Sequence, residues 1–146
     1  MTRGTVVSSV TAQPLTQTAR PARLFSVAFS PEQTRVARMR RVTRAFMRHW
    51  AVPEVLAENV VLCVSELVTN AIQHGHGDIG LRVRYTADEL RVDVTDGNHA
   101  PALLRAAGDD DVSGRGLLLV AMLAMDWGVD NDGTTTWCVF HVAGRL

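Results

Sequence analysis

Asp96 occupies a position where a carboxylate could recognise a ligand. Alternation of apolar and polar residues predicts a strand over residues 90–95 with one buried face, and Asp96 continues that face. Its charge needs hydrogen-bond donors, because an unpaired buried carboxylate is very costly. The donor could be a backbone N–H at Gly97 or a ligand group such as an exocyclic amine. Gly97 has no side chain and would let a flat ligand lie close to the backbone.

A second set of residues could bind phosphate: Gly114, Arg115, Gly116 and Leu117. A glycine-rich turn that leads into a helix presents free backbone N–H groups and the positive end of the helix dipole. The Arg115 guanidinium would add a charge-assisted donor. Two glycines before a helix are a weak signal alone, so they gain meaning only beside other candidate residues.

Glu66 and Asn70 stand four residues apart, which places both side chains on one face of a predicted helix. Helical geometry puts both at the border of the buried face, with Asn70 closer to it. Half-exposed polar pairs are common on helices. The pair alone therefore fits a structural role better than a functional one.

The spacing of apolar residues predicts the elements that must position these groups. In chain order they are a strand at 22–29, helices at 31–50 and 53–74, strands at 81–85 and 90–95, a helix at 117–125, and strands at 127–129 and 135–142. Ser30 followed by Pro31 is typical of a helix start. Helices and strands do not alternate one for one, so the order predicts an α+β fold: a two-layer sandwich, in which three helices cover one face of a mostly antiparallel mixed sheet.

Two segments lie outside these elements. Residues 1–20 are rich in Thr, Ser, Gln and Ala and contain no acid, which predicts a disordered tail before a domain at 21–146. Residues 98–113 show no periodicity. A loop of that length in a compact domain is usually functional or mobile.

Composition excludes several classes of protein. All 15 basic residues are arginine, and the 146-residue chain has no lysine. P-loops, eukaryotic-type protein kinases and Schiff-base catalysts each need a lysine and are excluded. No run approaches about 18 consecutive apolar residues, and residues 1–20 lack a signal-peptide core, so we expect no membrane span and no secretion. Cys63 and Cys138 lie in apolar runs, typical of reduced core thiols in the cytoplasm.

Charge is segregated along the chain although its sum is zero. Residues 1–50 contain nine arginines and one acid, whereas residues 51–146 contain six arginines and fourteen acids. The basic segment fits either a solvated helix face or a docking surface for an acidic partner. Overall neutrality, with no interleaved aromatic residues on that face, argues against direct nucleic-acid binding.

In their order along the chain, the candidate residues resemble those of the Bergerat-fold (GHKL) ATP-binding domain. The matching segments are SELVTNAIQHG on a helix, Asp96 and Gly97 at a strand end, GRGLLLV at a helix start, and Gly133 and Thr134 before the last strand. The resemblance covers about residues 22–143. More narrowly, the chain is similar to the anti-sigma-factor serine kinases, in the stand-alone form found in actinobacteria.

The resemblance implies a role for each matching residue. Asn70 would coordinate the Mg²⁺ that bridges the ATP phosphates, and Glu66 would be the general base for an attacking serine hydroxyl. Asp96, beside Gly97 and supported by Thr134, would accept from the adenine amino group. Residues 98–113 would be the ATP lid. The other matching positions would lie near the phosphates: His74, Gly114, Arg115, Gly116 and Leu117. Such a site works by positioning and charge neutralisation and needs no lysine.

Two features depart from the family pattern. Asn98 and Ala100 replace the glycines of its Asp-x-Gly-x-Gly motif. Asparagine can adopt a positive φ angle, but alanine does so at a cost. Asp109, Asp110 and Asp111 would bring negative charge near the phosphates and weaken ATP binding, unless they face solvent or bind Mg²⁺.

The resulting hypothesis is a cytoplasmic, ATP-binding, anti-sigma-factor-like serine kinase. The resemblance implies that it phosphorylates an anti-anti-sigma factor and sequesters a sigma factor, with the first helix and the surface near it as the docking region. A homodimer through the exposed edge strand and the first helix is also an expectation. The alternative is a non-catalytic module that keeps the nucleotide fold and acts by sequestering a partner. Glu66 favours the kinase, because phosphoryl transfer requires a base and ATP binding does not.

Overall fold

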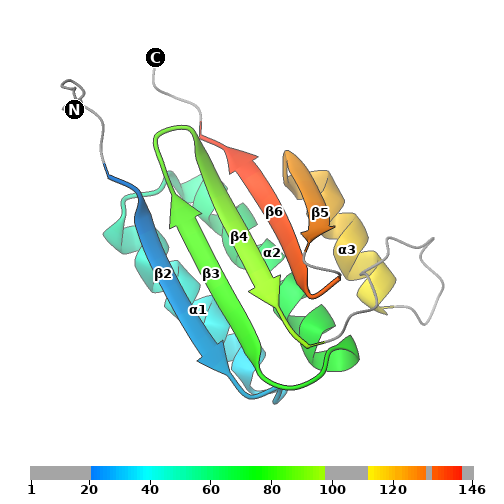
Figure 1. Cartoon of the computed structure of the whole chain (residues 1–146). Helices are drawn as coiled ribbons and strands as arrows, with labels where there is room; N and C mark the ends of the chain where they lie inside the picture. Colours follow the sequence, from blue (N-terminus) through cyan, green and yellow to red (C-terminus); the bar gives the residue numbers. More distant parts are fainter. Residues whose placement is uncertain (1–20, 98–111, 131–132, 143–146) are drawn as a thin grey trace, which may run out of the picture.

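The computed structural model describes residues 21–97, 112–130 and 133–142, with the backbone alone for 112–115. The elements in chain order are β2 (Arg23–Phe29), α1 (Arg35–His49), α2 (Glu54–His74), β3 (Ile79–Tyr85), β4 (Glu89–Thr95), α3 (Val112–Leu123), β5 (Asp126–Asp130) and β6 (Thr135–His141). The strands form one sheet in the order β2-β3-β4-β6-β5, and each neighbouring pair is antiparallel. All three helices lie behind one face of this sheet (Figure 1). The predicted α+β two-layer fold is confirmed.

Alternation along the central strands gives the sheet one apolar face and one polar face. Leu81 and Val83 of β3, and Leu90 and Val92 of β4, are fully buried against the helices. The residues between them point to the opposite face, which none of the described helices covers (Figure 1). Residues 90–95 therefore have the predicted register, with Asp96 following the buried side.

The central helix of the second layer is α2, which packs between α1 and α3 and against the sheet. Its predicted apolar stripe is buried at Val60, Cys63, Leu67 and Ala71. By length and composition α2 could cross a membrane, with a mean hydropathy of 1.5, but 44% of that window is buried inside the protein. Burial in a core explains the same apolar composition.

The two cysteines meet in this core as free thiols. Cys63 lies on α2 and Cys138 on β6, and both side chains are fully buried. Two causes raise the pKa of the Cys138 thiol well above its ordinary value: the larger is a hydrogen bond with Cys63, and the second is burial. The thiols therefore behave as apolar packing groups, as the sequence predicted.

Two helix starts differ from the predictions. The first helix begins at Arg35, because the residues after Ser30 form turns: the N–H of Glu32 donates to the carbonyl of Ser30, and the N–H of Arg35 donates to the carbonyl of Glu32. The third helix begins at Val112, before Gly114, so this glycine pair does not form a turn. Packing of α3 against α2 offsets the cost of about 1 kcal/mol for each helical glycine. From Gly116 onward, one side of α3 is buried and the other is not: Leu117 and Val120 are covered, whereas Met122 is 72% exposed.

The predicted tail at 1–20 and most of the predicted lid lie outside the described residues, as do Asn98, Ala100 and Asp109 to Asp111. Residues 112 and 113, which we assigned to the lid, belong to α3 instead.

Candidate nucleotide site

The C-terminal half of α2 carries the predicted base and metal ligand on one face. Glu66 and Asn70 are both half-buried, one turn apart. Burial raises the pKa of the Glu66 carboxyl above its ordinary value, and the nearby charge of Arg40 partly opposes this effect. A carboxyl of raised pKa, still close to water, is suited to accept a proton near neutral pH.

Gly116 of α3 lies directly against this carboxylate. A Cβ atom at Gly116 would lie 2.6 Å from Oε1 of Glu66, closer than any side chain allows. The glycine therefore permits the close approach of α3 to α2 at the predicted base. Leu117, the next residue, is buried beneath it in the core.

The predicted adenine-binding residues meet where β4 ends and β6 begins. The backbone N–H of Asp96 donates to the carbonyl of Thr134 at 2.8 Å, which joins the two strands beyond their paired residues. The N–H of Gly97, one alternative partner for the Asp96 carboxylate, donates to the carbonyl of His76 at 2.8 Å. Asp96 and Thr134 are both half-buried.

Gly75 brings the end of α2 against Asp96. The sequence predicts only that this glycine ends the helix. A Cβ atom at Gly75 would lie 2.7 Å from the carboxyl carbon of Asp96 and 2.8 Å from its Oδ2. The Asp96 carboxylate thus packs against the C-terminus of the helix that carries Glu66 and Asn70. The signal for this contact in the sequence was a glycine at the end of a helix, followed by a short loop and a strand.

Arg40 makes a contact that sequence periodicity does not predict. It lies on the exposed, basic side of α1, as helical spacing indicates. Its Nη1 nevertheless donates to Oγ of Ser65 on α2 at 3.2 Å, which brings its charge close to Glu66. Helical spacing alone cannot distinguish a side chain that reaches over to a neighbouring helix from one that points into solvent.

The structure therefore places most of the predicted residues around the C-terminal half of α2. Glu66 meets Gly116, and the end of α2 meets Asp96, which is bonded to Thr134. His74 is the last residue of α2, and its side chain is exposed. Gly114 and Arg115 belong to the first turns of α3, where the backbone alone is described.

This arrangement combines the groups that a nucleotide needs. A buried-edge carboxylate beside small residues can accept from a flat, donor-bearing ring, and a helix start can favour phosphate. A carboxamide, Asn70, and a second carboxylate, Glu66, lie one helical turn apart on α2. Three helices on one face of an antiparallel sheet, with these residues at one end, define an ATPase domain of the GHKL type.

A comparison with protein families agrees with this definition. The chain matches the family described as histidine kinase-like ATPase domain over residues 29–140. The match covers more than half of the chain, and the protein belongs to this family. Domains of this family bind ATP, generally with Mg²⁺, which supports an ATP-binding regulatory role. A comparison with curated proteins finds no match.

Proposed function

We propose that the protein is a cytoplasmic serine kinase of the anti-sigma-factor type. In this proposal it transfers the γ-phosphoryl group of ATP to a serine of an anti-anti-sigma factor. The supporting observation is the environment of Glu66: a half-buried carboxyl of raised pKa, one turn from Asn70 and in contact with Gly116. Nucleotide binding alone does not call for a base at that point.

Each protein group has one task in the reaction. Glu66 takes the proton of the attacking serine hydroxyl while the serine oxygen bonds to the γ-phosphorus and the bond to the β,γ-bridging oxygen breaks. The products are phosphoserine, ADP and the proton held by Glu66. Asp96 holds the adenine, and Thr134 holds the backbone that carries Asp96. Glycine at 116 avoids the steric clash that a Cβ atom would make with the base.

Asn70 fits the part of a magnesium ligand. Its carboxamide oxygen is a hard donor on the half-buried face of α2. Mg²⁺ in nucleotide sites keeps several waters and is held by one or two protein groups together with phosphate oxygens. One protein oxygen is thus sufficient, and when bound the ion neutralises the charge of the phosphates.

Glu66→Gln tests the base directly. The substitution keeps size and hydrogen bonding but cannot accept the proton, so we expect transfer from γ-labelled ATP to a purified anti-anti-sigma factor to fall by about 100-fold or more. ATP binding should stay within about threefold of the wild type, measured by calorimetry. Glu58→Gln, an exposed glutamate two turns earlier on α2, is the matched control and should retain transfer. Undiminished transfer in Glu66→Gln would remove Glu66 from this role.

The proposal also assigns partner surfaces to α1 and β2. We propose that α1 docks the sigma factor through its exposed arginines, among them Arg44 and Arg48, and that the edge strand β2 pairs with a second copy. Arg44→Gln with Arg48→Gln should weaken sigma binding at least tenfold, whereas Arg82→Gln should not.

If β2 pairs with a second copy of the chain, sedimentation should give twice the 15.9 kDa mass of the chain. A monomer at high concentration would refute pairing through β2.

The alternative, a partner-sequestering module without catalysis, predicts a different set of results. Sigma binding would persist, but no serine would be phosphorylated by the wild type. The contact between Glu66 and Gly116 would then have no functional consequence.

A further inference from the structure

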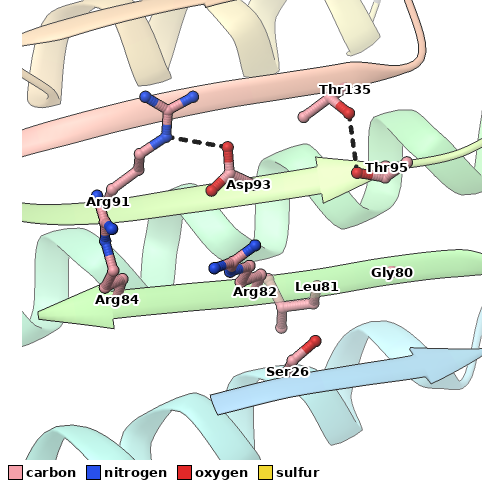
Figure 2. Close-up of a pocket in the computed structure, with 9 residues that line it drawn as sticks. All are labelled: Ser26, Gly80, Leu81, Arg82, Arg84, Arg91, Asp93, Thr95 and Thr135. Atoms are coloured by element: carbon pink, nitrogen blue, oxygen red, sulfur yellow. Dashed lines mark hydrogen bonds and ion pairs between the residues drawn. The ribbon is translucent and has the colours of Figure 1, made fainter. Parts of the chain in front are cut away.

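The uncovered face of the sheet carries a cavity that is separate from the candidate nucleotide site. Its volume is about 400 Å³, and its walls are side chains of β2, β3, β4 and β6 (Figure 2). Three of these are arginines, Arg82, Arg84 and Arg91, and the one acid is Asp93. Small-molecule sites in proteins occupy roughly 300–1,000 Å³, so the cavity lies within the range for a small ligand.

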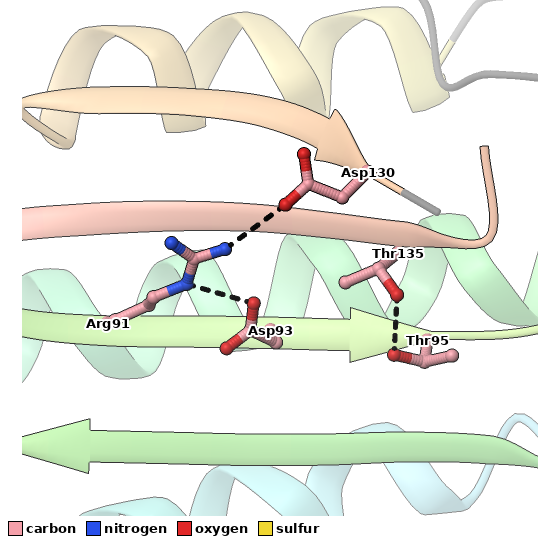
Figure 3. A network of polar contacts seen from close by, with 5 residues as sticks. All are labelled: Arg91, Asp93, Thr95, Asp130 and Thr135. Atoms are coloured by element: carbon pink, nitrogen blue, oxygen red, sulfur yellow. Dashed lines mark hydrogen bonds and ion pairs between the residues drawn. The ribbon is translucent and has the colours of Figure 1, made fainter. Parts of the chain in front are cut away.

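Arg91 is a fixed wall of this cavity. Its Nε donates to Oδ1 of Asp93 at 3.0 Å, and its Nη2 lies 3.5 Å from Oδ2 of Asp130 (Figure 3). The guanidinium also stacks on the ring of Trp137, 4.7 Å from the centroid. These contacts hold one positive group in place before any ligand arrives.

Arg82 and Arg84 supply the charge that remains available. Both side chains are exposed, and within the described part of the chain neither guanidinium has a hydrogen bond or an ion pair. Arg84 is directly opposite Arg91 in the β3–β4 register. Like charges in directly opposed positions destabilise a strand pair, so an anion between them would relieve the repulsion.

The other polar groups around the cavity are hydroxyls. Ser26 is opposite Arg82 in the β2–β3 register, and Thr95 and Thr135 bond to each other at 2.9 Å at the far end (Figure 2). Guanidinium groups and hydroxyls together are the donors that bind phosphate, and the planar guanidinium matches its oxygens in pairs. Asp93 and Asp130 both pair with Arg91, so the positive charge that remains uncompensated around the cavity is that of Arg82 and Arg84.

We propose that this cavity binds a small, multiply charged phosphate compound on the uncovered face of the sheet, with Arg82 and Arg84 as its principal contacts. The site is independent of the proposed kinase function. It lies next to the nucleotide-site residues in the chain, since Thr95 precedes Asp96 and Thr135 follows Thr134. A ligand there contacts the two strand ends that carry those residues.

Inorganic pyrophosphate is the probe, titrated by calorimetry at low salt into four proteins. The wild type should bind it. Arg82→Gln with Arg84→Gln should weaken binding at least about tenfold, because two charge-assisted contacts are lost. Arg38→Gln with Arg41→Gln, which removes the same charge from exposed positions of α1, should bind as the wild type does. Asn70→Ala should also retain binding, because it alters only the nucleotide site.

Three results would overturn this proposal. The first is the absence of binding by the wild type. The second is equal weakening in both arginine pairs, which would mean that only net charge matters. The third is loss in Asn70→Ala with retention in the Arg82 and Arg84 variant, which would place pyrophosphate in the nucleotide site. Thermal unfolding of each protein confirms that it is folded, as expected for substitutions of exposed side chains.

Discussion

At the scale of single residues, the proposed chemistry depends on how closely the backbone can approach two carboxylates. Gly116 allows α3 to reach Glu66, and Gly75 allows the end of α2 to reach Asp96. Both contacts are too short for a Cβ atom. The glycines therefore matter for the space they leave, and Gly116 does so inside a helix, where glycine is otherwise unfavourable.

Gly116→Ala should separate activity from stability. The added methyl group displaces the flexible Glu66 carboxylate, while alanine in a helix gains up to about 1 kcal/mol. We expect phosphoryl transfer to fall at least tenfold, with ATP still bound and the melting temperature changed by only a few degrees. Gly80→Ala in β3, where the added methyl meets nothing within 4 Å, is the matched control. Full transfer by Gly116→Ala would contradict the account.

The raised pKa of Glu66 has a consequence for stability. In the folded protein the protonated form is favoured, so the contribution of this group is full below its unfolded-state pKa, near 4.5, and is lost as pH rises through the folded-state value. Glutamine cannot ionise. The free energy of unfolding of Glu66→Gln relative to the wild type should therefore increase from pH 4 to pH 7, as measured by urea unfolding. A difference that stays constant or shrinks would show that folding does not raise the pKa of Glu66.

At the scale of elements, aromatic side chains fix β2 and α1 to each other. Phe25 stacks on Phe46 with ring centroids 4.4 Å apart, and Trp50 stacks on Tyr85 of β3 at 6.1 Å. Arg23 adds a hydrogen bond from Nη1 to the carbonyl of Trp50 at 2.9 Å. The edge strand and the end of the first helix thus form one unit.

Trp50→Ala should destabilise the protein by about 3–5 kcal/mol, because it removes a buried indole from this cluster. His49→Ala, at the exposed neighbouring position, should change stability by no more than about 0.5 kcal/mol. Chemical unfolding of the two variants measures both values. A loss of stability below about 1 kcal/mol for Trp50→Ala would mean that the aromatic cluster closes into the space left by the indole.

Local patterns predicted the elements well, and long-range packing explains where they failed. The burial of α2 and the β3–β4 hairpin followed from spacing alone, since each is set by the alternation of its own residues. The start of α3 did not, because glycines are unfavourable in a helix and the packing of Gly116 against Glu66 of α2 is not visible in a local pattern. Strand order was also beyond reach, since it depends on how β6 pairs with β4 across a distant part of the chain.

The same division holds for the candidate site. Asp96 and the Glu66–Asn70 pair could be identified from strand parity and helical spacing. The contacts of Gly75 with Asp96 and of Arg40 with Ser65 could not, because each joins segments that no local pattern relates.

At the scale of the whole molecule, the two faces of the sheet differ in what they can bind. The helical side carries the candidate nucleotide residues, drawn from α2, α3 and the adjoining ends of β4 and β6. The uncovered side carries exposed arginines around a polar cavity (Figure 2). The nucleotide residues come together only when both layers are packed, so nucleotide binding and folding are linked, and ATP should raise the stability of the folded state.

Calorimetric titration of ATP with Mg²⁺ tests the central claim most directly, on the wild type, Asn70→Ala and Asn59→Ala. Asn59 is a half-buried asparagine nearer the start of α2 and serves as the matched control. The account predicts binding by the wild type and by Asn59→Ala, and at least about tenfold weaker binding by Asn70→Ala. Absence of binding by the folded wild type, or equal affinity in all three proteins, would contradict it.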